Sequence, residues 1–194
     1  MPSTATGRRG RPKKLDLDEV LEAAMKILDR EGIDAVSFRR IAAELGVSHM
    51  TLYTYFDSKE SLLNAMVART LEVPALGEAR DRRWDLRLEE AMKEIHAVLV
   101  RRPGIAQLLI THEFEGERID EIRNRLLALL EPAGLGKQRT TDGISALFNY
   151  LFGTVMVESS RGLGGSATTF DYGLGLLIDG FRRAAGVRAP RRAV

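Results

Sequence analysis

The sequence predicts an all-α protein, and three observations lead to this fold class. Apolar residues recur every three or four positions along most of the chain, which is the spacing of the buried face of a helix. Proline and glycine separate these stretches, for example at Pro103-Gly104 and at Pro132, and such residues end helices. Of the 194 residues, 44% are hydrophobic and 29% are charged, as in a globular protein with a sizeable core. We expect one or two closely packed domains.

The composition excludes several kinds of chemistry. The chain has no cysteine, so it cannot form a disulfide, a thiolate nucleophile or a sulfur-ligated metal site. No apolar run approaches the ~20 residues of a membrane-spanning helix, and the basic N-terminus lacks the apolar stretch of a secretory signal. We expect an intracellular protein that has no membrane partner and needs no cofactor.

The net charge of +2 is unevenly distributed, with basic residues at both ends of the chain. The Arg-Gly-Arg-Pro segment near the N-terminus resembles the core of the AT-hook, a motif that binds the minor groove of DNA. An extended arginine segment is slim enough to fit the narrow minor groove of A·T-rich DNA. A disordered tail that binds nothing is the alternative. Arg182, Arg183, Arg188, Arg191 and Arg192 near the C-terminus are interpreted as residues that increase solubility. The N-terminal candidates for DNA contact are Arg8, Arg9, Arg11, Lys13 and Lys14.

Three short helices are predicted after the basic segment. Asp16 or Asp18 can cap the first helix, and Gly32 can end it. Ser37 opens the second helix, and Gly46 can make a tight turn with a positive φ.

The third helix is predicted over residues 48–55, with Ser48 as its cap and Leu52 on its buried side. Two short helices joined by a glycine turn form a helix-turn-helix, whose second helix enters the major groove of DNA. A helical hairpin that never contacts DNA is the alternative, because the spacing of Ala42, Gly46 and Leu52 occurs in both kinds of protein.

Residues 36–63, "VSFRRIAAELGVSHMTLYTYFDSKESLL", closely resemble the DNA-binding signature of TetR-type transcriptional repressors. In that family a helix-turn-helix is followed by a Leu-Tyr-x-x-Phe segment, a lysine and a fourth helix. The rest of the chain resembles the tetracycline-repressor-like C-terminal domain through "RRPGIAQLLI", "RIDEIRNRLLALLEPAGL" and "NYLFGTVMVE".

This resemblance implies a three-helix DNA-binding domain followed by a helical ligand-binding and dimerisation domain. It further implies a cytoplasmic, nucleoid-associated repressor that binds a palindromic operator in double-stranded DNA as a homodimer and is released by a small-molecule inducer. An architectural or activating DNA-binding protein without an inducer is the alternative. We expect five segments: a basic disordered arm (1–15), the helix-turn-helix domain (16–62), a linking helix and connector (63–83), the ligand-binding and dimerisation domain (84–186) and a basic tail (187–194).

The resemblance also assigns roles to individual residues at the DNA. Tyr53 and Tyr55 would contact the DNA backbone, with a core position as the alternative for Tyr55, and Lys59 would bind a phosphate at the start of the fourth helix. Asp57 and Glu60 are expected to form a capping box at that helix. The remaining candidates are Ser37, Arg39, Arg40, Ser48, His49, Met50, Thr51 and Thr54.

Two further sets of candidates lie in the C-terminal part. Residues 144–160 and 168–184 are predicted as helices with apolar residues on more than one face, as in helices that also pack against a second subunit. In the family that the chain resembles, these two helices form a homodimeric four-helix bundle, and intrachain core is the alternative for some of their residues. The resemblance thus implies the dimer-interface candidates Leu147, Leu151, Phe170, Leu174, Leu177 and Phe181. Methionine, aromatic and other large side chains are expected to line the inducer pocket, with ordinary core as the alternative for each. These candidates are Met66, Trp84, Met92, His96, Leu109, His112, Phe114, Phe148 and Phe152.

An enzymatic function finds no support in the motifs. The segment "AGLGKQ" lacks the upstream glycine and the Ser/Thr after lysine of a phosphate-binding loop, and "RGLGGSATT" follows a predicted helix where a nucleotide-binding loop would follow a strand. Both are expected to be interhelical loops. The three histidines are scattered, no Gly-x-Ser-x-Gly motif is present, and no His-x-x-x-His pair suggests a metal site.

Overall fold

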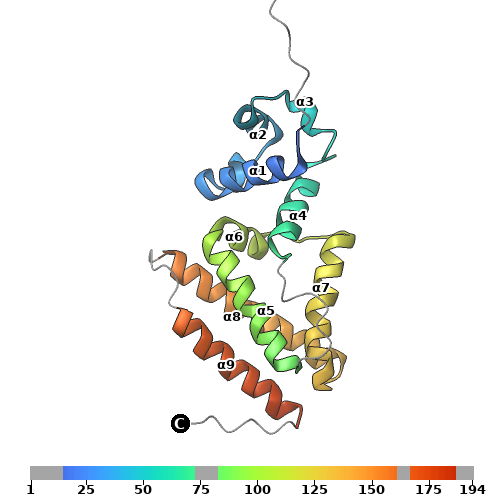
Figure 1. Ribbon diagram of the computed structural model, residues 1–194, viewed down its shortest axis with the longest axis vertical. Helices are drawn as coiled ribbons and strands as arrows, with labels where there is room; N and C mark the ends of the chain where they lie inside the picture. The colour runs from blue at the N-terminus through green and yellow to red at the C-terminus, as the bar shows by residue number, and fades with distance from the viewer. Residues whose placement is uncertain (1–14, 73–82, 161–166, 187–194) are drawn as a thin grey trace, which may run out of the picture.

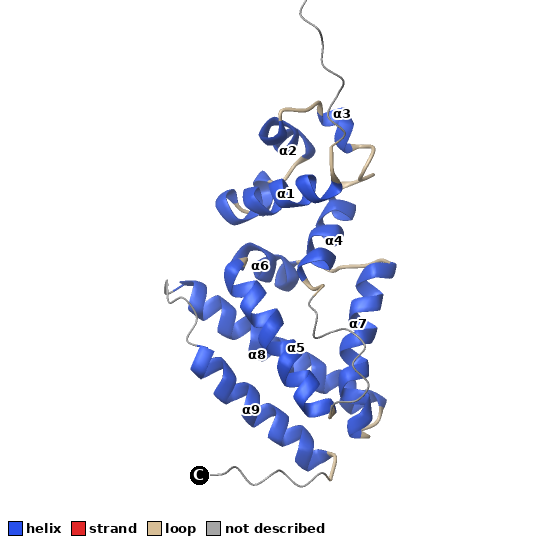
Figure 2. Ribbon diagram, in the orientation of Figure 1, coloured by secondary structure: helices blue, strands red, loops and turns tan. Residues whose placement is uncertain are grey.

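The computed structural model describes residues 15–72, 83–160 and 167–186. Every regular element in these ranges is a helix, and Figure 2 shows no strand among them, which confirms the predicted all-α fold class. None of the described helices has both the length and the apolar character needed to cross a membrane. The basic tail and the five basic residues predicted to contact DNA from the N-terminal arm lie outside the described residues.

The described elements are nine α-helices and two 3₁₀ helices. In chain order they are α1 (Leu17–Glu31), η1 (Ile33–Ala35), α2 (Phe38–Leu45), α3 (His49–Leu52), α4 (Lys59–Thr70), α5 (Trp84–Arg101), α6 (Pro103–Thr111), α7 (Glu117–Leu130), η3 (Glu131–Ala133), α8 (Lys137–Ser160) and α9 (Ala167–Ala184). Helices α1 to α3 form one end of the molecule and α5 to α9 the other, with α4 between them (Figure 1). At the larger end, α7 and α9 flank α5 and α8.

Most of the predicted helix boundaries are confirmed. The Asp16 side chain caps α1, and Gly32 ends this helix with a φ of 83°. Pro103 opens α6 at the position where its missing N–H costs nothing. The capping box predicted for α4 is wrong, because Ser58 and Ser61 form it instead of Asp57 and Glu60. The two hydroxyls accept the backbone N–H groups of Ser61 and Ser58, one residue further along the chain than in the predicted box, at the half-buried start of α4.

Helix α8 begins at Lys137, seven residues before the predicted start near residue 144. Its first turns are polar and contain Gly143, so the apolar pattern could not reveal them. Gly143 is required there because a Cβ would lie 2.8 Å from the ring of Phe181 and 2.9 Å from Leu130. The glycine therefore permits close packing against α9 and α7.

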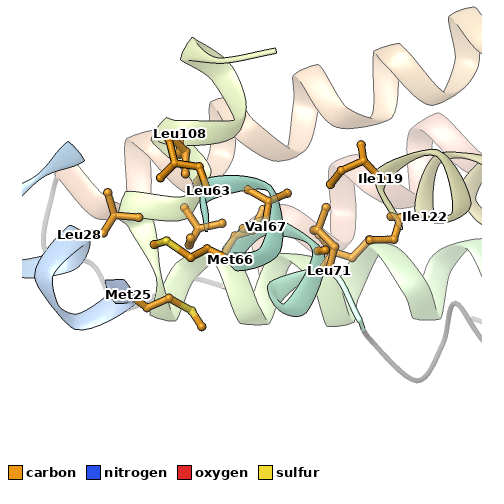
Figure 3. Close-up of a cluster of buried hydrophobic side chains, with 14 of the residues drawn as sticks. Met25, Leu28, Leu63, Met66, Val67, Leu71, Leu108, Ile119 and Ile122 are labelled. Atoms are coloured by element: carbon orange, nitrogen blue, oxygen red, sulfur yellow. The ribbon is translucent and has the colours of Figure 1, made fainter. Parts of the chain in front are cut away.

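One apolar core runs through both ends of the molecule, and α4 lies at its centre. Figure 3 shows Leu63 and Met66 of α4 beside Met25 and Leu28 of α1, with Leu108 of α6 above them. Toward the other end of α4, its Leu71 meets Ile119 and Ile122 of α7. A fully buried side chain of this kind stabilises the fold by about 2 kcal/mol. The same helix therefore holds the two ends together through apolar contacts.

Arg102 adds a polar connection between the two ends. It lies between α5 and α6, and its Nη2 is 2.9 Å from both carboxylate oxygens of Glu22 on α1. Its Nη1 is 3.3 Å from Oδ2 of Asp29, also on α1. Burial raises the pKa of Asp29, and the positive charge of Arg102 opposes this rise. A Cβ at Gly104 would lie 2.9 Å from Leu28, so glycine allows α6 to approach α1 closely.

A second ion pair fixes α9 on α5. The buried carboxylate of Asp85 lies 2.5 Å from Arg83 and 2.6 Å from Arg182. Burial by itself would raise the pKa of Asp85, but the hydrogen bonds and charges of the two arginines lower it below its usual value. Arg182 also lies 2.6 Å from Asp179. The C-terminal basic residue Arg182 is therefore a structural contact and not part of a solubilising tail.

Candidate nucleic-acid interface

The turn between α2 and α3 has the geometry of a helix-turn-helix. Ser37 caps α2 by accepting the N–H of Arg40 at 3.2 Å. Gly46 adopts the left-handed conformation, with φ 67° and ψ 31°, and the chain reverses there. Ser48 then caps α3 by accepting the N–H of Met50 at 3.3 Å. The three cap and turn positions predicted from the sequence are confirmed.

Helix α3 is shorter than the predicted range of 48–55, because it ends at Leu52. The next residues continue as a tighter turn, in which the N–H of Thr54 bonds to Thr51 and that of Tyr55 bonds to Leu52. These bonds span three residues, as in a 3₁₀ helix. The Thr54 hydroxyl also donates to the Thr51 carbonyl at 2.6 Å, which stabilises the turn.

One side of α3 is buried and the other is exposed. Leu52 is completely buried against the domain. Ser48, His49 and Met50 are exposed, Met50 with 61% of its surface, and Thr51 is half-buried. A hydroxyl, an imidazole and a thioether therefore project together from a short, rigid element.

Tyr53 combines a packed ring with an exposed hydroxyl end. Its ring meets that of Phe38 on α2 edge to face, with centroids 4.8 Å apart, while 51% of the residue remains exposed. Such a phenol is held in place by its apolar body and can donate a hydrogen bond outward. This is the arrangement expected for a contact with the DNA backbone.

Tyr55 and Lys59 have partners within the chain. The hydroxyl of the half-buried Tyr55 donates to the carbonyl of Leu15, which favours the alternative core role. The ammonium of Lys59 donates to the carbonyl of Ile33 at 3.0 Å. An ammonium has three N–H donors, so this bond leaves Lys59 able to bind a phosphate as well. For Lys59 that contact stays a prediction.

The two arginines of α2 differ. Arg40 lies 2.8 Å from Glu31, which ties α2 to the end of α1, and 3.0 Å from Glu44 on its own helix. Hydrogen bonds from Arg40 and Arg30 lower the pKa of Glu31 to about 2. Arg39 is exposed and makes no ion pair with a described residue. Of this pair, Arg39 is the better candidate for a phosphate contact.

The predicted inducer residues are spread over several environments. Met66 is buried in the core that links the two ends, and Met92 and His96 are buried on α5. Trp84, Leu109, Phe114, Phe148 and Phe152 pack against the core from partly exposed positions, whereas His112 is exposed. The hollows that described residues form along α1, α4 and α7 contain none of these nine side chains.

A buried polar cluster connects α5, α8 and α9. Nε2 of His96 lies 3.1 Å from Oε2 of Glu158, and the imidazole stacks on the ring of Phe170 with centroids 3.9 Å apart. Burial lowers the pKa of His96, and the charge of Glu158 opposes this. The other oxygen of Glu158 is buried without a hydrogen-bond partner among the described residues. Sequence reasoning missed Glu158, although a single acid closing the apolar run "GTVMVE" was a signal.

The predicted dimer interface needs correction. Leu147, Leu151, Phe170 and Leu174 are buried within a single chain, so they belong to the intrachain core. Leu177 and Phe181 are half-buried and pack against the same core. The apolar pattern identified α8 and α9 but could not separate their inner from their outer faces, because both faces carry large apolar residues.

The outer apolar face of α8 and α9 is formed by other residues. Val157 on α8 and Tyr172 and Leu176 on α9 are large and exposed. Gly153 and Gly180 lie on the same two helices, and a Cβ added to either would meet no atom within 4 Å. Exposed apolar groups beside open glycines allow another helix to approach closely. We call these five residues the α8–α9 face.

The fold and the exposed side of α3 define a helix-turn-helix DNA-binding regulator. The chain belongs to the tetR family of bacterial regulatory proteins, whose family model matches residues 20–66. A model of the tetracyclin repressor-like C-terminal domain matches residues 76–169. The resemblance noted in the sequence is thereby confirmed.

Known proteins resemble the chain in sequence and in structure. The HTH-type transcriptional repressor DrrR1 of Streptomyces coeruleorubidus is 36% identical over 154 residues, which are 76% of this chain and 56% of that protein. The chain therefore spans little more than half the length of this relative. The crystal structure of Mycobacterium smegmatis BioQ is 28% identical, with a TM-score of 0.71 over 88% of this chain and 99% of that one. A structure of BioQ with its double-stranded DNA operator is 26% identical, with a TM-score of 0.65 over 88% and 99% of the two chains.

The two tyrosines allow a matched test of the interface. Tyr55→Phe removes the hydrogen bond to Leu15 and should lower the free energy of unfolding by about 1 kcal/mol. Tyr53→Phe removes an outward hydroxyl and should leave that free energy within about 0.5 kcal/mol of the original, while it weakens DNA binding. Urea unfolding and fluorescence anisotropy on labelled DNA measure the two effects. The opposite pattern would show that the roles of the two residues are reversed.

Proposed function

We propose that the protein is a repressor that binds a palindromic operator as a homodimer and is released by a small-molecule inducer. The observation that carries this proposal is the exposed side of α3, held outward by the Gly46 turn and by the buried Leu52. The relative DrrR1 is named a transcriptional repressor, and BioQ was crystallised with its operator, which supports the assignment. The chain would act in the cytoplasm, where bacterial DNA lies.

Two kinds of DNA contact follow from the positions of the side chains. Ser48, His49 and Met50 would meet base edges in the major groove, because they project from the exposed side of α3. Tyr53, Arg39 and Lys59 lie beside this helix or on the elements that support it, and would bind phosphates. Phosphate contacts fix the position of the protein on DNA, whereas base contacts determine the preferred sequence.

The homodimer would form through the α8–α9 face. Its residues repeat every four positions, at 153 and 157 on α8 and at 172, 176 and 180 on α9, so each set lines one side of its helix. Helices α8 and α9 pack against each other, so the two rows lie on neighbouring helices. Two copies joined by this face would place two recognition helices on one DNA molecule. A two-fold pair reads half-sites about one helical turn apart, which explains the expectation of a palindrome.

An inducer would bind within the C-terminal domain, the part that matches the tetracyclin repressor-like model. The cluster of His96, Glu158 and Phe170 is our best candidate for its polar anchor there. The free oxygen of Glu158 can accept a hydrogen bond, and Phe170 supplies an aromatic surface. Linkage requires that inducer and operator weaken each other's binding by the same factor.

Selection of binding sites from random DNA tests the assignment of base and phosphate contacts. His49→Ala and Met50→Ala should change the selected consensus, because a good base contact contributes about 1–3 kcal/mol of discrimination. Arg39→Ala should keep the consensus, weaken binding to operator and random DNA by similar factors and reduce the salt slope by about 1. An unchanged consensus in both His49 and Met50 variants would refute the base contacts. Selection of A·T-rich DNA without a palindrome would favour the architectural alternative.

The α8–α9 face is tested by introducing a charge into it. Leu176 is 57% exposed in the single chain and lies at the centre of the proposed interface. Leu176→Arg would bury an unpaired positive charge there on dimerisation. The variant should be monomeric at micromolar concentration and should lose operator binding. Ile110→Arg on α6 is the matched control, because Ile110 is 51% exposed and lies outside the face. Light scattering after gel filtration measures the mass; a dimeric Leu176→Arg variant, or a monomeric Ile110→Arg variant, would contradict the proposed interface.

A further inference from the structure

A groove lies where the DNA-binding end meets the C-terminal domain. Helices α1 and α4 form one wall, and the start of α7 with the residues just before it forms the other. The volume of the groove is about 470 Å³, within the range of sites for small organic molecules. None of the proposed DNA contacts, inducer candidates or residues of the α8–α9 face lines it. The groove is therefore distinct from the three functional regions described above.

Part of the groove surface is apolar. Leu17 at the start of α1 is 43% exposed, which is high for a large apolar residue. The buried residues Leu21 and Ala68, from α1 and α4, and Ile119 from α7 contribute to the same surface. Two domains thus offer one apolar strip, and an apolar group placed there would contact both of them.

The charged residues around this strip are mostly acidic. Among the described side chains that line the groove, Asp18, Glu72, Glu115 and Glu117 are acidic and Arg69 is basic. That arginine forms an ion pair with Asp18, so its charge is already balanced. The chain as a whole has a net charge of +2, and the groove therefore has the opposite sign to the protein. The side chains of Glu115 and Glu117 are exposed and make no ion pair with a described residue.

The helix dipole accounts for the positions of two of these acidic residues. Asp18 and Glu117 each lie in the first turn of a helix, where a negative charge is favourable. The dipole of a helix does not require that acids at the start of α1, just after α4 and around the start of α7 all line one apolar groove. Nor would an acidic groove assist binding to DNA phosphates. The amide of Asn64, which makes no hydrogen bond with a described residue, adds a polar group inside the groove.

We propose that this interdomain groove binds a small organic cation with an apolar body, of the class of arylalkylamines. The ammonium group would lie between Glu115 and Glu117, and the apolar body would lie along Leu17 and Ile119. Such a ligand contacts α1 and α4 on one side and α7 on the other, so it stabilises the observed spacing of the two domains. The site goes beyond the proposed function, because binding to it requires neither operator nor inducer.

Calorimetric titration of the full chain with 4-phenylbutylammonium at low salt tests the proposal. The uncharged 4-phenylbutan-1-ol is the control for the charge, since it shares the apolar body. We expect the cation to bind with one site per chain and at least about fivefold more tightly than the alcohol. Absence of cation binding, or equal affinity for the alcohol, would overturn the proposal.

Variants locate the binding site. The double substitution Glu115→Gln and Glu117→Gln removes two exposed charges, preserves the shape of the groove and should weaken binding of the cation by about fivefold. Glu131→Gln is the matched control, because Glu131 is exposed on η3 and does not line the groove. It should leave the affinity unchanged. Equal affinities for the double variant and the original chain would place the cation elsewhere and refute the site. Because the titration contains no DNA, its outcome is independent of whether the operator model holds.

Discussion

The burial of α4 between two groups of helices is the interaction on which the rest of the structure depends. Helix α3 has only four residues, and an isolated helix of that length is not stable in water. Its position is therefore imposed by its surroundings: Leu52 is buried below it, and the following turn is fixed by Tyr55. These contacts belong to a small domain whose core continues through α4 into α6 and α7 (Figure 3). The position of α3 therefore depends on the same apolar core that stabilises the rest of the chain.

The same continuity explains how the C-terminal domain can influence DNA binding. Apolar contacts of α4 and the ion pairs of Arg102 connect α1 with α6 and α7, so a shift of these helices changes the position of α1. In the proposed homodimer, two copies joined by the α8–α9 face would need a fixed distance between their recognition helices to match a palindrome. A ligand that favours another arrangement of α4 or α6 would alter that distance, and the two binding events would be coupled.

The sequence was most informative where structure is determined locally. Ser37, Gly46 and Ser48 act through their own backbone and the next turn, so their roles could be predicted and are confirmed. Tertiary contacts could not be predicted in the same way. Ser58 caps α4 in place of the predicted Asp57, and the ammonium of Lys59 donates to the carbonyl of Ile33, 26 residues earlier in the chain. The inner and outer faces of α8 and α9 have similar apolar content. Only the packing of both helices against α5, and of α8 against α6 and α7, distinguishes the two faces.

Equilibrium unfolding in urea tests most directly whether one core joins the two ends. Trp84, the single tryptophan, lies at the start of α5 and packs against the core, so its fluorescence reports on the C-terminal domain. Far-ultraviolet circular dichroism reports on all helices, including α1 to α4. The shared core predicts one transition, with the same midpoint for both signals at the same protein concentration. A helical signal that falls in two steps, one of them without a change in Trp84 fluorescence, would show that the DNA-binding end unfolds independently and would contradict this account.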